Sequence, residues 1–203
     1  MDICVLNDHY ELVQVIDQFD SFCWTDRYNE AGEFELQALA NITILSYVQK
    51  GLYLKIQDSD RLMLIDTVEF TSDVENGDHL KATGQSLERI LKWRVILNEI
   101  TLDGSLQEGI MRLLNDNIID PPDSKRMFPI ITFKKSDDPA ITGLTVNITF
   151  KGETLYDAVA GICQAYNIGF RMLPDYTNYG FIFELYAGVD RSYNQEKLPQ
   201  IVF

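Results

Sequence analysis

The chain has 203 residues, 46% of them hydrophobic, so it can bury one large core or two small ones. It carries 31 acidic and 17 basic side chains, and the resulting net charge of −14 disfavours binding to the phosphates of nucleic acids. No segment has the roughly 20 consecutive apolar residues that span a bilayer, and the first residues lack a secretory signal pattern. We therefore expect a globular protein with no direct nucleic-acid binding and no membrane segment.

The cysteine and asparagine motifs fit a reducing compartment. Cys4, Cys23 and Cys163 are odd in number, far apart and without a C-x-x-C pair, so the sequence indicates neither a disulfide framework nor a zinc site. Two N-x-T sequons begin at Asn41 and Asn147. Because no export signal precedes them, we expect ordinary strand residues at both places rather than glycosylation sites.

The first half of the chain has the period-two pattern of half-buried strands. Polar and apolar residues alternate over residues 33–38 and 52–57. Residues 61–71 and 79–83 flank an Asn-Gly step, which can supply the positive φ angles of a hairpin turn. A short helix is then expected after residues 84–86, before the chain becomes extended again.

The second half changes character and predicts helices between strands. Ser105 and Glu108 have the spacing of a capping box, and apolar residues follow at helical intervals up to Leu114. Two prolines at 121–122 end this helix and leave a loop or an edge strand behind it. The remaining pattern predicts a strand, a helix and a hairpin, at residues 144–150, 154–166, and 170–173 with 181–186.

Side chains that could carry catalysis lack suitable partners in the sequence. The two histidines, His9 and His79, each lie beside a predicted turn. Residues 84–88 resemble a nucleophile elbow without its second glycine, and we interpret them as a helix cap. Glu33 and Glu35 could act as paired carboxylates, but they alternate with apolar residues and fit a solvated strand face. We expect no catalytic residue and no enzyme activity.

No cofactor or metal site is expected either. Asp73, Glu75 and Asp78 resemble a calcium loop, but the glycine falls one position early, so we interpret them as a hairpin tip. Neither glycine-rich phosphate-binding motif occurs. Several aromatic residues could instead line a sugar-binding surface, which keeps a carbohydrate-binding module open as an alternative: Trp24, Tyr28, Trp93, Tyr176 and Tyr179.

Two segments about 150 residues apart carry a resemblance to a known family. Residues 22–36 read FCWTDRYNEAGEFEL, and residues 186–195 read YAGVDRSYNQ. Between them, residues 84–94 read GQSLERILKWR. In this order, the three segments resemble the siphovirus tail hub family of phages and prophages of Gram-positive bacteria, and the resemblance spans nearly the whole chain.

The resemblance implies an α+β, β-rich fold in which a tube-like β-barrel domain is interrupted by a small inserted α/β domain. Residues 1–97 together with 185–203 would form the barrel, and residues 98–184 the insertion. Members of this family are usually longer, so the chain would correspond to the N-terminal portion of a hub.

The resemblance also implies a structural role at the tip of a phage or prophage tail. A hub of this kind is a homotrimeric ring that closes the tail tube and contacts the distal tail protein, the tape-measure protein and other tail-tip proteins. It would be assembled in the host cytoplasm and end up in the virion. A carbohydrate-binding module for cell-wall recognition is the alternative, and a glycosidase-like enzyme the third hypothesis.

Charged residues recur in both family segments, and we expect them to form a structural cluster. Arginine can bond a carboxylate at two points, so such pairs can fix the register of distant chain segments. The competing interpretation is that they are solvated surface charges of little energetic weight. The expected cluster joins the first and last segments of the barrel and consists of Asp26, Arg27, Glu30, Asp190 and Arg191.

Overall fold

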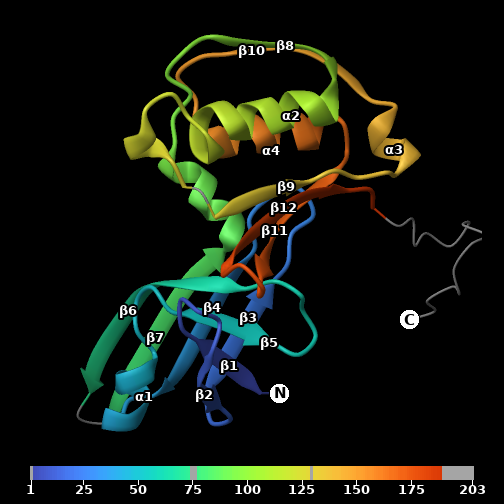
Figure 1. The fold of residues 1–203 in the computed structure, drawn as a ribbon. Helices are drawn as coiled ribbons and strands as arrows, with labels where there is room; N and C mark the ends of the chain where they lie inside the picture. The colour runs from blue at the N-terminus through green and yellow to red at the C-terminus, as the bar shows by residue number, and fades with distance from the viewer. Residues whose placement is uncertain (1, 74–76, 129, 189–203) are drawn as a thin grey trace, which may run out of the picture.

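The computed structural model describes residues 2–73, 77–128 and 130–188. Figure 1 shows a lower part made of a large sheet and an upper part that contains the longer helices. The chain builds the lower part first and then crosses once into the upper part (Figure 1).

The lower part is a curved antiparallel sheet of seven strands in the described residues. Their order across the sheet is β2-β1-β5-β6-β7-β4-β3. The strands are β1 (Ile3–Leu6), β2 (Leu12–Ile16), β3 (Ser21–Thr25), β4 (Glu33–Leu39), β5 (Tyr53–Ile56), β6 (Met63–Asp73) and β7 (Gly77–Ser86).

Alternating residues explain why these segments form strands with one buried face. In β4, Phe34, Leu36 and Ala38 are buried, whereas Glu33 is exposed. The long hairpin predicted around the Asn-Gly step is confirmed, because β6 and β7 pair from Met63 with Ser86 out to Asp73 with Gly77. Gly77 has a φ of +85°, as that hairpin end requires, while residues 74–76 lie outside the described residues.

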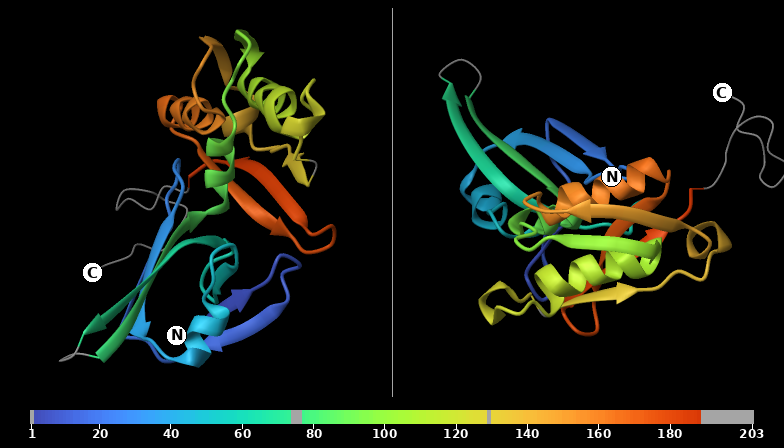
Figure 2. Two further views of the ribbon diagram at one scale, coloured as in Figure 1. Left: turned by 90° about the vertical axis from the view of Figure 1, so that its left-hand side faces the viewer. Right: turned by 90° about the horizontal axis from the view of Figure 1, so that it is seen from above.

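The curvature of the sheet follows from how its two edge strands are connected. β2 and β3 lie at opposite edges, yet only residues 17–20 join them. A flat sheet of seven strands would separate its edges by about 29 Å, since neighbouring strands lie about 4.8 Å apart. The connection from Ile16 to Ser21 can span at most about 18 Å. The sheet must therefore curl toward closure, as Figure 2 shows.

The upper part places helices between two small sheets (Figure 1). β8 pairs with β10 in an antiparallel ladder, while β12 pairs antiparallel with β11 and parallel with β9. The elements are η1 (Leu87–Trp93), β8 (Ile100–Ser105), α2 (Leu106–Leu114), η2 (Asn115–Ile119), η3 (Ser124–Arg126), β9 (Ile131–Lys134), α3 (Pro139–Thr142), β10 (Thr145–Phe150), α4 (Leu155–Ala165), β11 (Gly169–Asp175) and β12 (Gly180–Tyr186).

Both longer helices begin where capping side chains predict. The Ser105 hydroxyl accepts a hydrogen bond from the Glu108 amide at 3.5 Å, and the Thr154 hydroxyl accepts one from the Asp157 amide at 3.0 Å. The helices predicted after Ser105 and over residues 154–166 are thus confirmed as α2 and α4. The strand expected over residues 144–150 is confirmed as β10.

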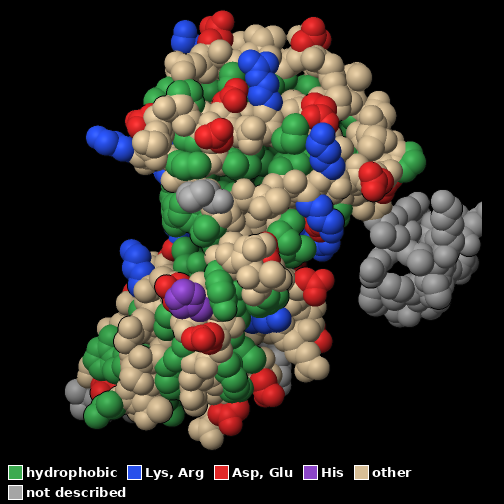
Figure 3. Space-filling model, viewed as in Figure 1, with side chains coloured by type: hydrophobic (Ala, Val, Ile, Leu, Met, Phe, Trp, Pro, Cys, Tyr) green, Lys and Arg blue, Asp and Glu red, His purple; other side chains and the backbone are tan. Residues whose placement is uncertain are grey.

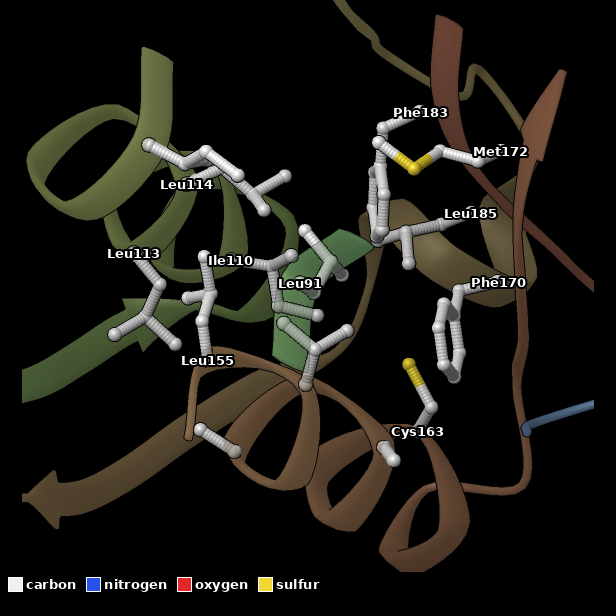
Figure 4. Packing of buried hydrophobic residues seen from close by; sticks show 14 of the residues in the cluster. Leu91, Ile110, Leu113, Leu114, Leu155, Cys163, Phe170, Met172, Phe183 and Leu185 are labelled. Carbon is white, nitrogen blue, oxygen red and sulfur yellow. The ribbon is translucent and has the colours of Figure 1, made fainter. Parts of the chain in front are cut away.

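Two clusters of buried side chains form the interior. The first, the sheet core, includes Ile3, Leu36, Leu54 and Ile65 and lies within the seven-stranded sheet. The second, the helix core, packs α2, α4 and η1 against β11 and β12, and Figure 4 shows part of it. Its most deeply buried members include Leu91, Ile110, Leu114, Phe170 and Phe183.

The cysteines have three different environments. Cys163 is buried in the helix core, and this burial raises the pKa of its thiol to about 12. Cys23 is exposed on the edge strand β3, and Cys4 is half-buried on β1. All three are free thiols, so only Cys163 fully fits the expectation of a small apolar residue.

The structure corrects one of the two sequon expectations. Asn147 lies on β10, as expected for a strand residue. Asn41 instead caps the short helix α1 (Ile42–Tyr47), where its side chain accepts a hydrogen bond from the Ile44 amide at 2.9 Å. Asparagine favours this position because its side chain satisfies an amide that the first helical turn leaves unpaired.

The expected β-barrel corresponds to this curled sheet, whose hydrogen bonding does not close. Within the described residues, no ladder joins β2 to β3. The α+β, strand-rich class agrees with the structure. Leu87, Ile90 and Ile96 pack in the helix core, and the division into residues 1–97 with 185–203 and residues 98–184 stays a prediction.

Candidate functional site

Three charged residues of the first family segment, Asp26, Arg27 and Glu30, lie in the loop between β3 and β4. Arg27 pairs with Glu33 at 2.5 Å and with Glu30 at 3.8 Å. These side chains are 41–53% exposed. The hydrogen bond to Glu33 raises the pKa of the Arg27 guanidinium, but solvent screening keeps such an exposed pair weak.

Asp26 faces a different set of partners from Arg27. It accepts hydrogen bonds from the Trp24 indole at 3.1 Å and from the Ser59 hydroxyl at 3.0 Å. The Arg61 guanidinium lies 3.8 Å from its carboxylate. The predicted cluster is therefore split in the described residues, with Arg27 and Glu30 on one side and Asp26 on the other.

Arg61 is the buried centre of this region, although the sequence did not single it out. Only 7% of its side chain is exposed. It donates hydrogen bonds to the Glu88 carboxylate at 2.8 Å, to the Arg27 carbonyl at 2.8 Å and to the Tyr186 hydroxyl at 3.2 Å. We call Asp26, Ser59, Arg61, Glu88 and Tyr186 the charged junction.

Glu88 extends the charged junction from η1 to the three-stranded sheet. Its side chain is fully buried and also accepts a hydrogen bond from the Met172 amide of β11 at 3.0 Å. Burial raises the pKa of the Glu88 carboxyl, and the Arg61 charge opposes that rise. A buried charge pair of this kind is costly to break, because either partner alone would be left unpaired and desolvated.

The two family segments meet beside the charged junction. The Tyr186 hydroxyl donates to the Tyr28 carbonyl at 3.1 Å, and the Gly188 amide donates to the Tyr28 hydroxyl at 2.6 Å. The two tyrosine rings pack edge to face at 5.3 Å. A β-carbon at Gly169 would lie 2.5–2.7 Å from these rings, so only glycine fits there.

Asp190 and Arg191, the charged pair of the second family segment, lie outside the described residues. Their place in the cluster stays a prediction. Gly188, two residues before Asp190, already contacts Tyr28 of the first segment.

A second contact joins the lower and upper parts of the molecule. The Tyr10 hydroxyl of the β1–β2 connection donates to the Gly180 carbonyl of β12 at 2.5 Å. Its ring packs against the rings of Tyr53, Tyr176 and Phe181. We call this the tyrosine contact, and burial raises the pKa of the Tyr10 hydroxyl.

The candidate catalytic carboxylates are engaged in ion pairs with basic side chains. Glu33 bonds Arg27, and Glu35 bonds Lys81 at 2.9 Å, which lowers the pKa of the Glu35 carboxyl. The alternating pattern of a solvated outer face is confirmed by the buried Phe34 between them. The two side chains are 53% and 41% exposed, so neither lies in the desolvated pocket of a catalytic acid.

The residues that resembled a nucleophile elbow also have a structural role. Ser86 is buried, and its hydroxyl accepts a hydrogen bond from the Gly32 amide at 2.7 Å. Ser86 occupies the N-cap position of η1, as the helix-cap interpretation predicted. Its side chain, however, accepts no hydrogen bond from the amides of the first turn. His79 lies 3.2 Å from Asp20 and not beside this serine.

Of the aromatic residues considered for sugar binding, Trp93 and Tyr176 are linked by ring contacts through Phe128, Phe181 and Tyr10, and Tyr179 lies beside them on His9. Trp24 and Tyr28 belong to two other groups. Trp24 stacks on Phe34, whereas Trp93 packs edge to face on Phe128. The others contact Tyr186, Tyr10 or His9, and they are, in that order, Tyr28, Tyr176 and Tyr179. The groups therefore do not define a common sugar platform.

Metal sites and membrane spans were searched in the described residues. These residues contain no group of three or more metal-ligating side chains. In the same part of the chain, no helix is long and apolar enough to cross a membrane. Asp73 and Asp78 of the expected hairpin tip lie on β6 and β7, while Glu75 is not among the described residues.

Two solved structures with a similar fold are tail proteins. Prophage tail protein gp18 from Listeria monocytogenes EGD-e has a TM-score of 0.58 at 15% identity, over 91% of this chain and 50% of that chain. The tail protein from Neisseria meningitidis MC58 has a TM-score of 0.54 at 13% identity, over 90% and 49%. The chain spans about half the length of these two structures, and its fold is that of phage tail proteins.

Residues 2–203 match the family described as Siphovirus ReqiPepy6 Gp37-like protein. The chain therefore belongs to this siphovirus tail protein family, and the resemblance seen in its sequence is confirmed. A comparison with curated proteins gives no match. As a member of a phage tail family, the protein is a virion component.

Proposed function

We propose that the chain is the N-terminal portion of a hub at the tail tip, which acts as a homotrimeric ring rather than as an enzyme. The observation that carries this proposal is the charged junction. Its buried charges bond to backbone and to one another across β11, β12, η1 and two loops. Charges placed in this way fix the positions of elements, which suits a protein that works through its assembly.

The proposed partners are the distal tail protein, the tape-measure protein and other tail-tip proteins. The test is to purify the chain in two ways, alone and after co-expression with the distal tail protein. The mass of each species is then measured by light scattering. We expect trimers that appear as rings in electron micrographs. A monomer under both conditions would contradict the ring.

The absence of enzyme activity is tested separately from assembly. The purified protein is incubated with host cell walls, and released reducing ends are measured. We expect no release above that of a heat-inactivated sample. Release that disappears in a Glu35→Gln variant would overturn the non-enzymatic part of the proposal.

We also propose that Asp190 and Arg191 complete the charge cluster with Asp26, Arg27 and Glu30. The hydrogen bond from the Gly188 amide to the Tyr28 hydroxyl supports this proposal, because it joins the two family segments close to these charges. A double-mutant cycle between Glu30→Gln and Arg191→Gln tests it through the free energy of unfolding. We expect a coupling of about 0.5–1 kcal/mol, and additive effects would contradict the pair.

The division of the chain into a tube-like domain and an insertion is likewise a proposal. The sheet core supports it, since its buried members all lie between Ile3 and Ala82, although the helix core also takes Leu87, Ile90 and Ile96 from the first part of the chain. Limited proteolysis followed by mass spectrometry should first cut near residues 97 and 185. Initial cuts within the seven-stranded sheet would contradict these boundaries.

A further inference from the structure

Two hairpin tips, one from each part of the molecule, meet at the tyrosine contact. The β1–β2 hairpin brings Tyr10 from the lower part, and the β11–β12 hairpin brings Tyr179 and the Gly180 carbonyl from the upper part. The His9 ring packs edge to face on the Tyr179 ring at 5.2 Å, and the Tyr10 ring packs in the same way on the Tyr176 ring at 5.3 Å. The left-hand view of Figure 2 shows the two tips side by side. Because each tip is the end of its own hairpin, the tips can separate without breaking a strand pair.

Both tips hold a tyrosine in the left-handed backbone conformation. Tyr10 has a φ of +60° and Tyr179 a φ of +51°. A hairpin turn normally places glycine or asparagine at such a position, because a bulky side chain is strained there. Among the described residues, Asn167 is the other non-glycine residue with a positive φ. Strain that persists at both tips indicates that the contact between the tips, and not the local sequence, fixes their conformation.

The other end of the β11–β12 hairpin is held by the charged junction. The Arg61 guanidinium donates to the Tyr186 hydroxyl at 3.2 Å, and the Met172 amide donates to the Glu88 carboxylate at 3.0 Å. Gly180 and Tyr186 are the two ends of β12, and at about 3.3 Å per residue they lie roughly 20 Å apart. Glu88 belongs to η1, directly after the chain crosses between the two parts. The hairpin is thus attached at its base by buried charges and at its tip by the tyrosine contact.

Water reaches the tip of this hairpin more easily than its base. Tyr176 and Tyr179 at the tip are 50% and 51% exposed, whereas the Arg61 side chain is 7% exposed and the Glu88 side chain is fully buried. Figure 3 shows that the molecule narrows where the lower and upper parts meet. A contact with exposed members opens at a lower cost in free energy than a fully buried one. The tip should therefore open first, while the base stays fixed.

We propose that the tyrosine contact is a releasable lock between the two parts of the molecule. When the lock opens, the β11–β12 tip moves away from the β1–β2 tip, and the charged junction acts as the hinge. Release lets Tyr10 and Tyr179 leave the left-handed conformation, so the strain of the closed arrangement favours opening. A partner that binds either tip only in the open arrangement would shift the equilibrium toward it.

The distance between the two hairpins tests the lock. Spin labels are attached through Gln14→Cys and Thr177→Cys, at exposed positions of the two hairpins, in a chain that also carries Cys4→Ala and Cys23→Ser. Labelled chains are diluted with unlabelled ones, so that double electron–electron resonance measures distances within one copy. Tyr10→Asn suits the left-handed conformation but lacks the ring, and it should raise the ratio of long to short distances at least about tenfold. Tyr10→Phe loses only the hydroxyl and should give a smaller rise.

Two control variants separate a lock at the tip from a general loosening of the fold. Tyr186→Phe removes a hydroxyl at the base of the hairpin, and Asn167→Gly changes a left-handed residue outside both tips. Both should leave the distance ratio unchanged. Thermal unfolding checks that every variant folds, and Tyr10→Phe provides the comparison in a chain that keeps the packed ring. The proposal is overturned if both Tyr10 variants give the wild-type ratio, or if Tyr186→Phe raises the ratio as much as Tyr10→Asn does.

Discussion

At the scale of single residues, the charged junction depends on one buried pair. Arg61 and Glu88 are both almost inaccessible to solvent, and each also bonds backbone of another element. Desolvation of the two charges offsets much of their attraction, so the pair adds little net stability over an apolar pair. It nevertheless selects one arrangement of η1 and β11, because every other arrangement leaves a charge unpaired.

Loss of one partner of this pair should be strongly destabilising. We expect Glu88→Gln to lower the free energy of unfolding by about 3–5 kcal/mol, since Arg61 would remain buried without its carboxylate. Glu35→Gln is the matched control, because Glu35 pairs with Lys81 on the surface, and it should have a much smaller effect. Urea denaturation measures both, and equal effects would contradict the junction's role.

A second residue predicts how stability changes with pH. Burial raises the pKa of Glu184, but Lys134 at 3.0 Å and Arg171 at 2.5 Å outweigh this and lower the pKa below its usual value of 4.5. The unfolded chain then takes up the proton at higher pH than the folded chain does. The contribution of Glu184 is therefore complete above the unfolded pKa and is lost as the pH falls through the folded one.

Glu184→Gln removes this contribution. The difference in the free energy of unfolding between wild type and variant should be largest near neutral pH and should shrink below about pH 4.5. Denaturant titrations at a series of pH values measure it. A difference that stays constant down to the acid limit would show that the charge of Glu184 is not what stabilises the fold.

At the scale of elements, close packing of β6 and β7 depends on a glycine. A β-carbon at Gly84 would lie 1.9 Å from the Leu64 carbonyl oxygen and 2.5 Å from the Phe34 ring. Gly84→Ala should destabilise the protein by about 1–3 kcal/mol. Gly161 of α4 has nothing within 4 Å of such an atom, so Gly161→Ala should stabilise it by about 0.5–1 kcal/mol. Thermal unfolding that gave both changes the same sign would refute this.

The elements were predictable from sequence where their signals are local. Alternation in β4, the Asn-Gly hairpin and the Ser105 cap each depend on a few neighbouring residues, and the structure contains all three elements. The short helix after Asn41 was missed because its sequence is rich in β-branched residues. Its asparagine cap was the one signal that could have identified it.

Long-range pairings could not be predicted in the same way. Arg61 and Glu88 are 27 residues apart, and nothing near either one indicates a buried partner. The parallel pairing of β9 with β12 joins positions 50 residues apart. The family segments did indicate Asp26 and Arg27, but the cation that Asp26 faces is Arg61, which lies in neither segment.

At the scale of the whole molecule, the charged junction and the tyrosine contact join the sheet core to the helix core. We expect both cores to unfold in one transition. Trp24 packs on the sheet core and Trp93 on Phe128 of the upper part, so Trp93→Phe and Trp24→Phe variants report on each separately. Their fluorescence transitions in urea should coincide.

Adding Glu88→Gln and Tyr10→Phe to these reporters removes a bond from each contact between the cores. The two fluorescence midpoints should then separate, because the cores lose part of their coupling. Identical midpoints in the two triple variants would mean that other packing transmits the cooperativity.

The four-residue connection between β2 and β3 also limits how the protein can misfold. Edge strands invite pairing with other chains, and flat sheets are the form that stacks into fibrils. This sheet cannot become flat while β2 and β3 both keep their places, since the connection is too short to reach across it. Aggregation through a flattened sheet would first require β2 or β3 to detach. The short connection therefore slows aggregation, although both edge strands leave backbone groups unpaired within the sheet.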